Sequence, residues 1–377
     1  MTNIAAQKPR EIRSLTGLRG IAAVWVMIFH AEFYQNPWNV PRVIVDHGYL
    51  AVDLFLILSG YVMALNYGHL FRDRVSLPTA MAFLRRRFAR TYPLYFVMTC
   101  LVLALSHWNM IALWHAKGQV CDARALIPNL LLVQSWATRF CSIDAPGWSI
   151  SAEWGAYLLF PFLCGTFLFG SGIRLWTSTI LAVCVLVVLG VLSTDWLAEQ
   201  GYRFGPLNIS NTMTIAPAIR CLAGFAIGLT VYRVAQSRMA VRMAAHGWPS
   251  IVVGGAILAL TCVRGGDVAI VLLFGVLILT LTSDNGVLAA ALNYTAVYFL
   301  GEVSYSIYMV HFPVLLVTRE MLVRLPQAYG EYAIDLTAWF STIALSTVTY
   351  FTIERPARRL LSSAPPRSLR LRPGLGN

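Results

Sequence analysis

Two ionisable side chains lie within the first long apolar run of this 377-residue chain, in the segment SLTGLRGIAAVWVMIFH. Arg19 comes first, and His30 follows eleven residues later. Ionisable groups are costly at membrane depth and usually face a functional cavity, so the pair predicts a site and not a lipid-facing surface. An imidazole titrates near neutral pH and suits a general base, whereas a guanidinium binds phosphate oxygens. We therefore expect proton transfer near one side chain and anion binding near the other.

Three further titratable groups are expected at the level of His30. The helical rise of about 1.5 Å per residue places His30 roughly 17 Å from Arg19, in the outer half of the span. His311, in SYSIYMVH, reaches a similar depth, and Asp53 and Glu153 each lie about five residues into spans entered from outside. We expect Glu153 to orient the imidazole, with Asp53 as second choice. The structural alternatives are a backbone hydrogen bond for each histidine, and a helix cap or ion pair for each acid.

Arginines gather at the opposite, cytoplasmic end. Arg85, Arg86, Arg87 and Arg90 precede a tyrosine and a proline in RRRFARTYPLY. Such clusters usually only mark the cytoplasmic side of a span, but next to Arg19 they could bind a phosphate-bearing donor that enters from the cytoplasm. Arg220, within IAPAIRCLAGFAIGL, needs a partner at membrane depth, and a structural ion pair is as good an explanation as a site.

Composition places these residues in an integral membrane protein. Hydrophobic residues make up 58% of the chain and charged residues only 12%, which is too little polar surface for a soluble globule. The apolar runs are about 20 residues long, the length that an α-helix needs to cross a bilayer. The net charge of +12 lies in short clusters between apolar runs, so it predicts topology and not nucleic-acid binding. The predicted fold class is an all-α, polytopic membrane protein.

Basic clusters on the cytoplasmic side predict an even number of crossings, with both termini cytoplasmic. The first run carries Arg19 and lacks a small-residue cleavage site, so it is expected to stay as a span. The ten candidate spans cover residues 15–35, 48–67, 92–113, 148–169, 174–193, 212–233, 248–263, 268–283, 296–317 and 333–352. The run 126–137 is too short to cross and is expected to be re-entrant or interfacial. The membrane domain is assigned to 1–360 and a disordered basic tail to 361–377.

The seven cysteines show no metal-ligand spacing, so no metal site is expected. Cys121 and Cys141 flank the short 126–137 run on the expected outer face. An oxidising compartment could join these two in a disulfide.

Several segments, taken in order along the chain, resemble the acyltransferase 3 family of bacterial membrane O-acyltransferases. The matching segments are TGLRGIAAVWVMIFH, GYLAVDLFLILSGYVM, RRRFARTYPLY, WSISAEWGAYLLFP, IRCLAGFAIG, SYSIYMVH and YFTIERPARRL. The resemblance implies a ten-helix membrane core. It also implies transfer of an acyl group, most often acetyl from acetyl-CoA as co-substrate, to a hydroxyl of an extracytoplasmic or lipid-linked glycan such as an exopolysaccharide or O-antigen.

The resemblance also implies roles for individual residues. His30 corresponds to the catalytic histidine, and Glu153 and His311 correspond to motif positions near it. The implied donor-binding residues are Arg19, Arg86, Arg87 and Arg90. Direct transfer and an acyl-histidine intermediate are both compatible with these residues.

The expected location is the bacterial inner membrane, as a multi-pass protein. The implied partners are acyl-CoA, the glycan acceptor, membrane lipids and polysaccharide-assembly proteins, with no nucleic acid. The alternative function is a secondary transporter or flippase for a glycan or solute, in which the histidines and carboxylates relay protons. Transporters often have repeated halves, and the sequence shows no such pairing, which favours the enzyme.

Overall fold

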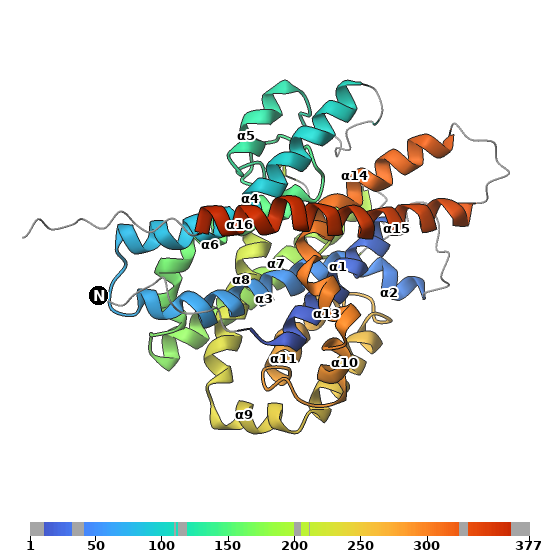
Figure 1. Ribbon diagram of the computed structural model, residues 1–377. Coiled ribbons are helices and arrows are strands. Elements are labelled where there is room, and N and C mark those ends of the chain that lie inside the picture. The colour runs from blue at the N-terminus through green and yellow to red at the C-terminus, as the bar shows by residue number, and fades with distance from the viewer. Residues whose placement is uncertain are drawn as a thin grey trace, which may run out of the picture.

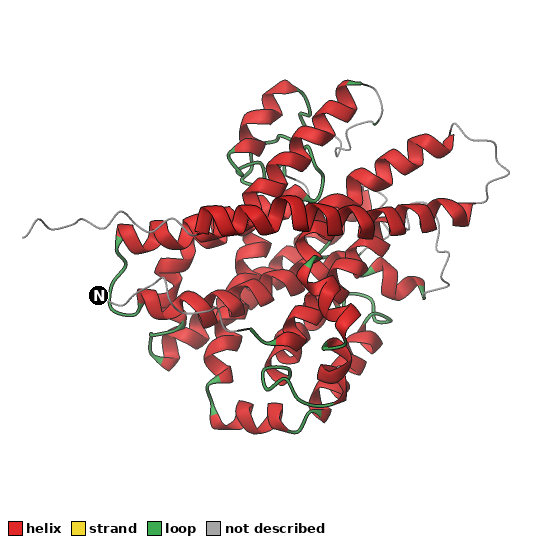
Figure 2. Cartoon of the chain, viewed as in Figure 1, coloured by secondary structure: helices red, strands yellow, loops and turns green. Residues whose placement is uncertain are grey.

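The computed structural model describes residues 11–31, 41–108, 111, 119–199, 205–210, 212–323 and 331–362, and helices dominate this part of the chain (Figures 1 and 2). Within these ranges the only β pairing is an isolated bridge between Val120 and Phe140. The predicted all-α class is therefore confirmed.

The helices of the first half are α1 (Arg13–Ala31), α2 (Arg42–Asp46), α3 (Ala51–Tyr67), α4 (Leu77–His107), α5 (Leu126–Leu130), α6 (Gly147–Phe167) and α7 (Gly172–Glu199). Those of the second half are α8 (Ala216–Ala235), α9 (Arg238–Ala245), α10 (Trp248–Leu260), α11 (Asp267–Thr280), α12 (Val287–Leu292), α13 (Thr295–Glu302), α14 (Ser304–Val323), α15 (Glu331–Thr349) and α16 (Arg355–Ser362). Short 3-10 turns occur at Gly48–Leu50, Gly68–Phe71 and Ala123–Ala125, and a π-helical turn, η4, at Tyr350–Glu354.

Six of the described helices are long and apolar enough to cross a membrane, or up to eight if each of two bent helix pairs forms one span. The bent pairs are α9 with α10, which meet at 86°, and α13 with α14, which meet at 72°. The protein therefore has a multi-pass architecture, whereas the count of ten crossings and the cytoplasmic location of both termini stay predictions.

Glycines allow the central helices to approach closely. α3 crosses α8 at Gly60 and Gly228, and an added Cβ on either glycine would lie 2.1 Å from a backbone oxygen of the other helix. α1 meets α13 in the same way, because a Cβ on Gly20 would lie 2.6 Å from the backbone nitrogen of Gly301. These contacts hold α1, α3, α8 and the α13–α14 corner in one core.

The short 126–137 run does not form a span. Its helix, α5, ends at Leu130, and turns follow to Ala137. The buried side chain of Asn129 anchors it by donating to the carbonyl of Cys141 at 2.9 Å and accepting from the backbone N–H of Ile143 at 3.0 Å. Cys121 and Cys141 are joined in a disulfide, with their Cα atoms 5.2 Å apart. The disulfide closes the segment around α5 beside α6.

The C-terminal helices α15 and α16 form one long rod across the molecule, with η4 between them (Figure 1). The rod ends at Ser362. The tail predicted for 361–377 lies outside the described residues from position 363 onward.

Candidate active site

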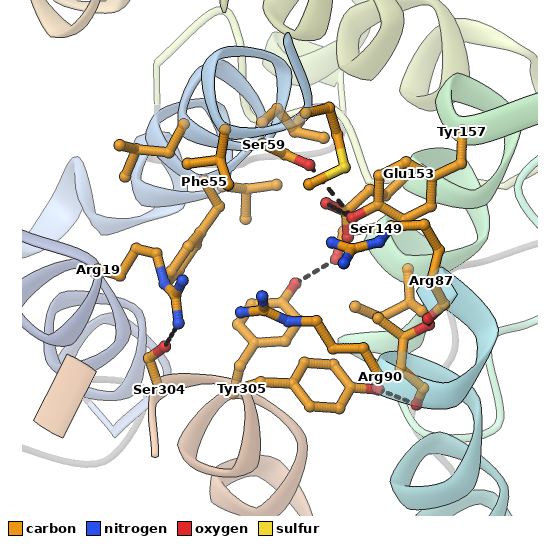
Figure 3. A pocket seen from close by; sticks show the side chains of 18 residues that line it. Arg19, Phe55, Ser59, Arg87, Arg90, Ser149, Glu153, Tyr157, Ser304 and Tyr305 are labelled. Atoms are coloured by element: carbon orange, nitrogen blue, oxygen red, sulfur yellow. Dashed lines mark hydrogen bonds between the residues drawn. The ribbon is translucent and has the colours of Figure 1, made fainter. Parts of the chain in front are cut away.

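Five helices, α1, α3, α4, α6 and α14, line one cavity (Figure 3). α3 contributes an apolar wall that includes Val52, Phe55 and Val62. Arginine side chains project into the cavity from α1 and α4, while α6 and α14 supply hydroxyl groups and one carboxylate. A cavity with an apolar wall and a few polar groups is suited to an elongated ligand that carries charge at one end.

Three guanidinium groups, those of Arg19, Arg87 and Arg90, reach this cavity (Figure 3). Arg19 Nη2 donates to the carbonyl oxygen of Gly301 at 3.0 Å, which fixes its position at the α13–α14 corner. Arg87 Nη2 donates to the hydroxyl of Tyr67 at 2.9 Å, and its buried Nε has no partner among the described residues. Several cations in one cavity favour an anionic ligand.

The basic cluster on α4 splits into two groups. Of its four arginines, all within the described residues, Arg87 and Arg90 line the cavity, whereas Arg85 and Arg86 do not. The predicted donor set therefore loses Arg86 as a cavity residue. The sequence could not separate Arg86 from its neighbours, because successive helical residues point in directions about 100° apart and the facing side depends on packing.

The two candidate acids lie away from the histidines. Asp53 is fully buried and forms a two-pronged ion pair with Arg220, whose Nε donates to Oδ1 at 3.0 Å. A buried charge requires such a partner. The ion pair that was the structural alternative for Asp53 and for Arg220 is therefore present. Glu153 lines the cavity and accepts a hydrogen bond from the hydroxyl of Tyr157 at 2.6 Å. The expected contact of either acid with His30 is therefore replaced by these partners.

His30 instead contacts His311. The Nδ1 atom of His30 lies 3.2 Å from the Nε2 atom of His311, and the ring centroids are 5.0 Å apart. The predicted common depth of the two histidines thus corresponds to a direct contact between α1 and α14. Phe29 and Phe312 pack edge-on against the His30 ring, with centroids 5.1 and 5.5 Å away.

Backbone carbonyls determine the tautomers of this histidine pair. His311 Nδ1 lies 3.1 Å from the carbonyl of Ile307, which can only accept, so Nδ1 carries the proton and Nε2 of the neutral ring is an acceptor. His30 Nδ1 then carries a proton that it shares between His311 Nε2 and the carbonyl of Val26 at 3.0 Å. This hydrogen-bond network assigns the lone pair of neutral His30 to Nε2.

Tyr308 connects the cavity to the histidine pair. It lines the cavity, its hydroxyl lies 2.6 Å from Ser149 Oγ, and its ring centroid is 5.8 Å from that of His311. Neither Tyr308 nor Ser149 is among the site residues predicted from the sequence. The available signal was spacing, since Tyr308 precedes His311 by three residues and so lies on the same helix face.

Comparison with known proteins agrees with this arrangement. The family described as the acyltransferase domain, acyltransferase 3, matches residues 12–354. That range contains both histidines and all the arginines that line the cavity. No solved structure matches the chain.

Two of three similar proteins described here carry acyltransferase names. Acyltransferase MdmB of Streptomyces mycarofaciens is 28% identical over 95% of both chains. Protein 2 in the picA locus of Rhizobium radiobacter is 40% identical, over 41% of this chain and 74% of its own. Peptidoglycan O-acetyltransferase OatA of Listeria monocytogenes is 22% identical over 93% of this chain but only 56% of its own length. The chain therefore belongs to the acyltransferase 3 family and is an acyltransferase.

Proposed function

We propose that the protein transfers an acetyl group from acetyl-CoA to a hydroxyl of an extracytoplasmic or lipid-linked glycan. The observation that carries the proposal is the lining of the cavity, which includes Arg19, Arg87 and Arg90 and also Tyr308, whose ring lies beside His311. A CoA thioester has the matching form, with phosphates at one end and the reactive carbonyl at the other. The name of the Listeria relative, a peptidoglycan O-acetyltransferase, supports a glycan as acceptor.

His30 Nε2 is the proposed general base. It takes the proton of the acceptor hydroxyl while the oxygen attacks the thioester carbonyl carbon, and the carbon–sulfur bond then breaks. The CoA thiolate leaves and takes that proton from His30, so the products are an ester and a free thiol. His311 accepts from Nδ1 of His30 and thereby holds the ring in the required tautomer. An acyl-histidine intermediate would use the same Nε2 atom as nucleophile.

The remaining polar groups act at the ends of the cavity. Arg19, Arg87 and Arg90 bind donor phosphates, and the hydroxyls of Tyr308 and Ser149 stabilise the oxyanion as it forms. Glu153 lies near Arg87 and Tyr157 and positions the donor end of the cavity, a role that replaces its expected contact with His30. Asp53 stabilises α3 against α8 through Arg220.

Donor dependence is the experiment that tests this proposal. Full-length protein purified in nanodiscs is supplied with acetyl-CoA and a lipid-linked oligosaccharide, and release of free thiol is followed. We expect thiol release that depends on both the protein and the acceptor, and ester formation on the glycan. Solute movement across vesicles that is indifferent to acetyl-CoA, without thiol release, would instead support the transporter alternative.

The acceptor itself is identified in cells. Surface polysaccharide from cells with and without the gene is compared by mass spectrometry and NMR, before and after mild alkali. We expect one base-labile acetyl ester to be missing from the deleted strain and restored by the wild-type gene. Identical polysaccharides in both strains would contradict a surface glycan acceptor.

A further inference from the structure

A buried acid at the end of the π-helical turn η4 holds an arginine of α16. Glu354 is only 2% exposed, and it accepts from Ser306 Oγ at 3.0 Å and from Arg358 Nη1 at 3.4 Å. π-Helical turns are rare and occur frequently at functional sites, because they change the direction in which side chains point. Here the turn lies between α15 and α16, and its Glu354 contacts Ser306 of α14, next to the cavity residues Ser304 and Tyr305.

Arg358 contacts this carboxylate directly, and Arg19 lies close by, with its Nη2 atom 3.4 Å from Ser304 Oγ on the helix that also carries Ser306. α16 packs against α4, and Arg90 of α4 is the charge that acts most strongly on Arg358. Both of these arginines also act electrostatically on Arg19, and all three attract Glu354. Glu11 also acts on Arg19 and Arg87 also acts on Arg358, so the positive charges outnumber the acids, and an anion would relieve the repulsion between the guanidinium groups.

A structural role alone does not account for this arrangement. Two of the arginines, Arg19 and Arg90, project into the cavity (Figure 3). The side chain of the third, Arg358, is 40% exposed, so the protein itself does not enclose it. A simple cytoplasmic anchor would not need a buried acid to hold its guanidinium beside two others.

We propose that Arg358 binds a phosphate group together with Arg19 and Arg90, so that the C-terminal helix α16 forms part of the donor entrance. The ligand class is a phosphate monoester or diphosphate. The inference rests on the proposed function, because the acyl-CoA donor supplies these phosphates. Arg358 belongs to the segment YFTIERPARRL, and the family match itself ends four residues earlier, at residue 354.

Binding of radiolabelled acetyl-CoA to the full-length protein in phosphatidylcholine nanodiscs tests the proposal. A charge-assisted hydrogen bond contributes enough that Arg358→Gln should weaken binding by about tenfold or more. Arg358→Lys should recover part of the affinity because it keeps the charge. Arg355→Gln is the matched control, since it removes an equal charge from the exposed neighbour that packs on Phe351, and it should bind like the wild type.

Glu354→Gln gives a prediction of opposite sign that misfolding would not produce. It removes the negative charge but keeps acceptor capacity for Ser306 and Arg358, so acetyl-CoA should bind several-fold more tightly. If Arg358→Gln binds like the wild type, the inference is wrong while the proposed function stands. If the wild type itself binds no acetyl-CoA, both are wrong. If Arg358→Gln weakens acetyl-CoA binding only in nanodiscs that contain phosphatidylglycerol, Arg358 binds a lipid headgroup. That result would overturn its role in donor binding.

Discussion

The hydrogen bond between His30 and His311 determines which nitrogen of His30 can accept a proton. The carbonyl of Ile307 requires a proton on His311 Nδ1, and this leaves His311 Nε2 to accept from His30. The two residues are 281 positions apart and come from different helices, yet together they define one base. In the proposed mechanism, His311 is therefore a positioning residue for His30.

Replacement of His311 by phenylalanine tests this role at the residue scale. His30 Nδ1 would keep the carbonyl of Val26 as its remaining acceptor. The preference for the tautomer with the proton on Nδ1 would therefore become weaker but would not disappear. We expect kcat to fall by about tenfold to a hundredfold, the equivalent of one charge-assisted hydrogen bond, with little change in KM for acetyl-CoA. Steady-state kinetics in nanodiscs measures both. A kcat equal to that of the wild type would contradict the positioning role.

The sequence was sufficient to predict that His30 and His311 lie at the same level, but not which partner each acid has. Helical rise alone placed His30 and His311 at one depth, because both lie within single helices. The partner of Asp53 is Arg220, 167 residues away, and such pairings depend on how helices pack. Arg358 was missed because its cluster was already explained by topology.

At the element scale, the crossing of α3 and α8 positions the apolar wall of the cavity. Gly60 and Gly228 let the two backbones touch, and α3 carries Phe55 and Ser59 just before that crossing. Apolar run length was enough to predict where the long helices lie. It did not predict the 72° bend between α13 and α14 or the π-helical turn η4, which depend on contacts with other helices.

Gly60→Ala should destabilise the protein, because the new Cβ would lie 2.1 Å from the backbone oxygen of Phe225. A backbone atom within a helix can move away only if the helix itself shifts. Overpacking of this kind costs about 1–3 kcal/mol, so the thermal unfolding midpoint in detergent should fall by several degrees. Gly165→Ala in α6 is the matched control. Its Cβ would meet nothing within 4 Å, so the midpoint should stay the same or rise slightly. Equal midpoints for the two variants would show that the α3–α8 contact is looser than described.

At the scale of the whole molecule, charge and apolar length together define the orientation of the site. Arg87 and Arg90 belong to a basic cluster that predicts the cytoplasmic side, so the proposed donor would enter from that side. The acceptor would reach His30 from the opposite side. This arrangement would carry an acyl group across the membrane while it is being transferred.

The topology predicts that both termini lie in the cytoplasm. Two reporters are fused at each terminus and in the α5 segment. Alkaline phosphatase is active only outside the cytoplasm, whereas green fluorescent protein fluoresces mainly inside it. We expect fluorescence from both termini and phosphatase activity from the α5 segment. Termini on opposite sides would require an odd number of crossings and would reverse the proposed direction of donor entry.

The most direct test of the account is acetyl transfer by His30→Gln, measured beside acetyl-CoA binding in the same nanodisc preparation. Loss of a general base costs about 10²–10⁴-fold in rate, so transfer should fall at least a hundredfold while acetyl-CoA still binds with wild-type affinity. His69→Gln, at an exposed histidine on the Gly68–Phe71 turn, is the control and should leave both unchanged. Transfer by His30→Gln at a rate near the wild type would contradict the assignment of His30 as the base.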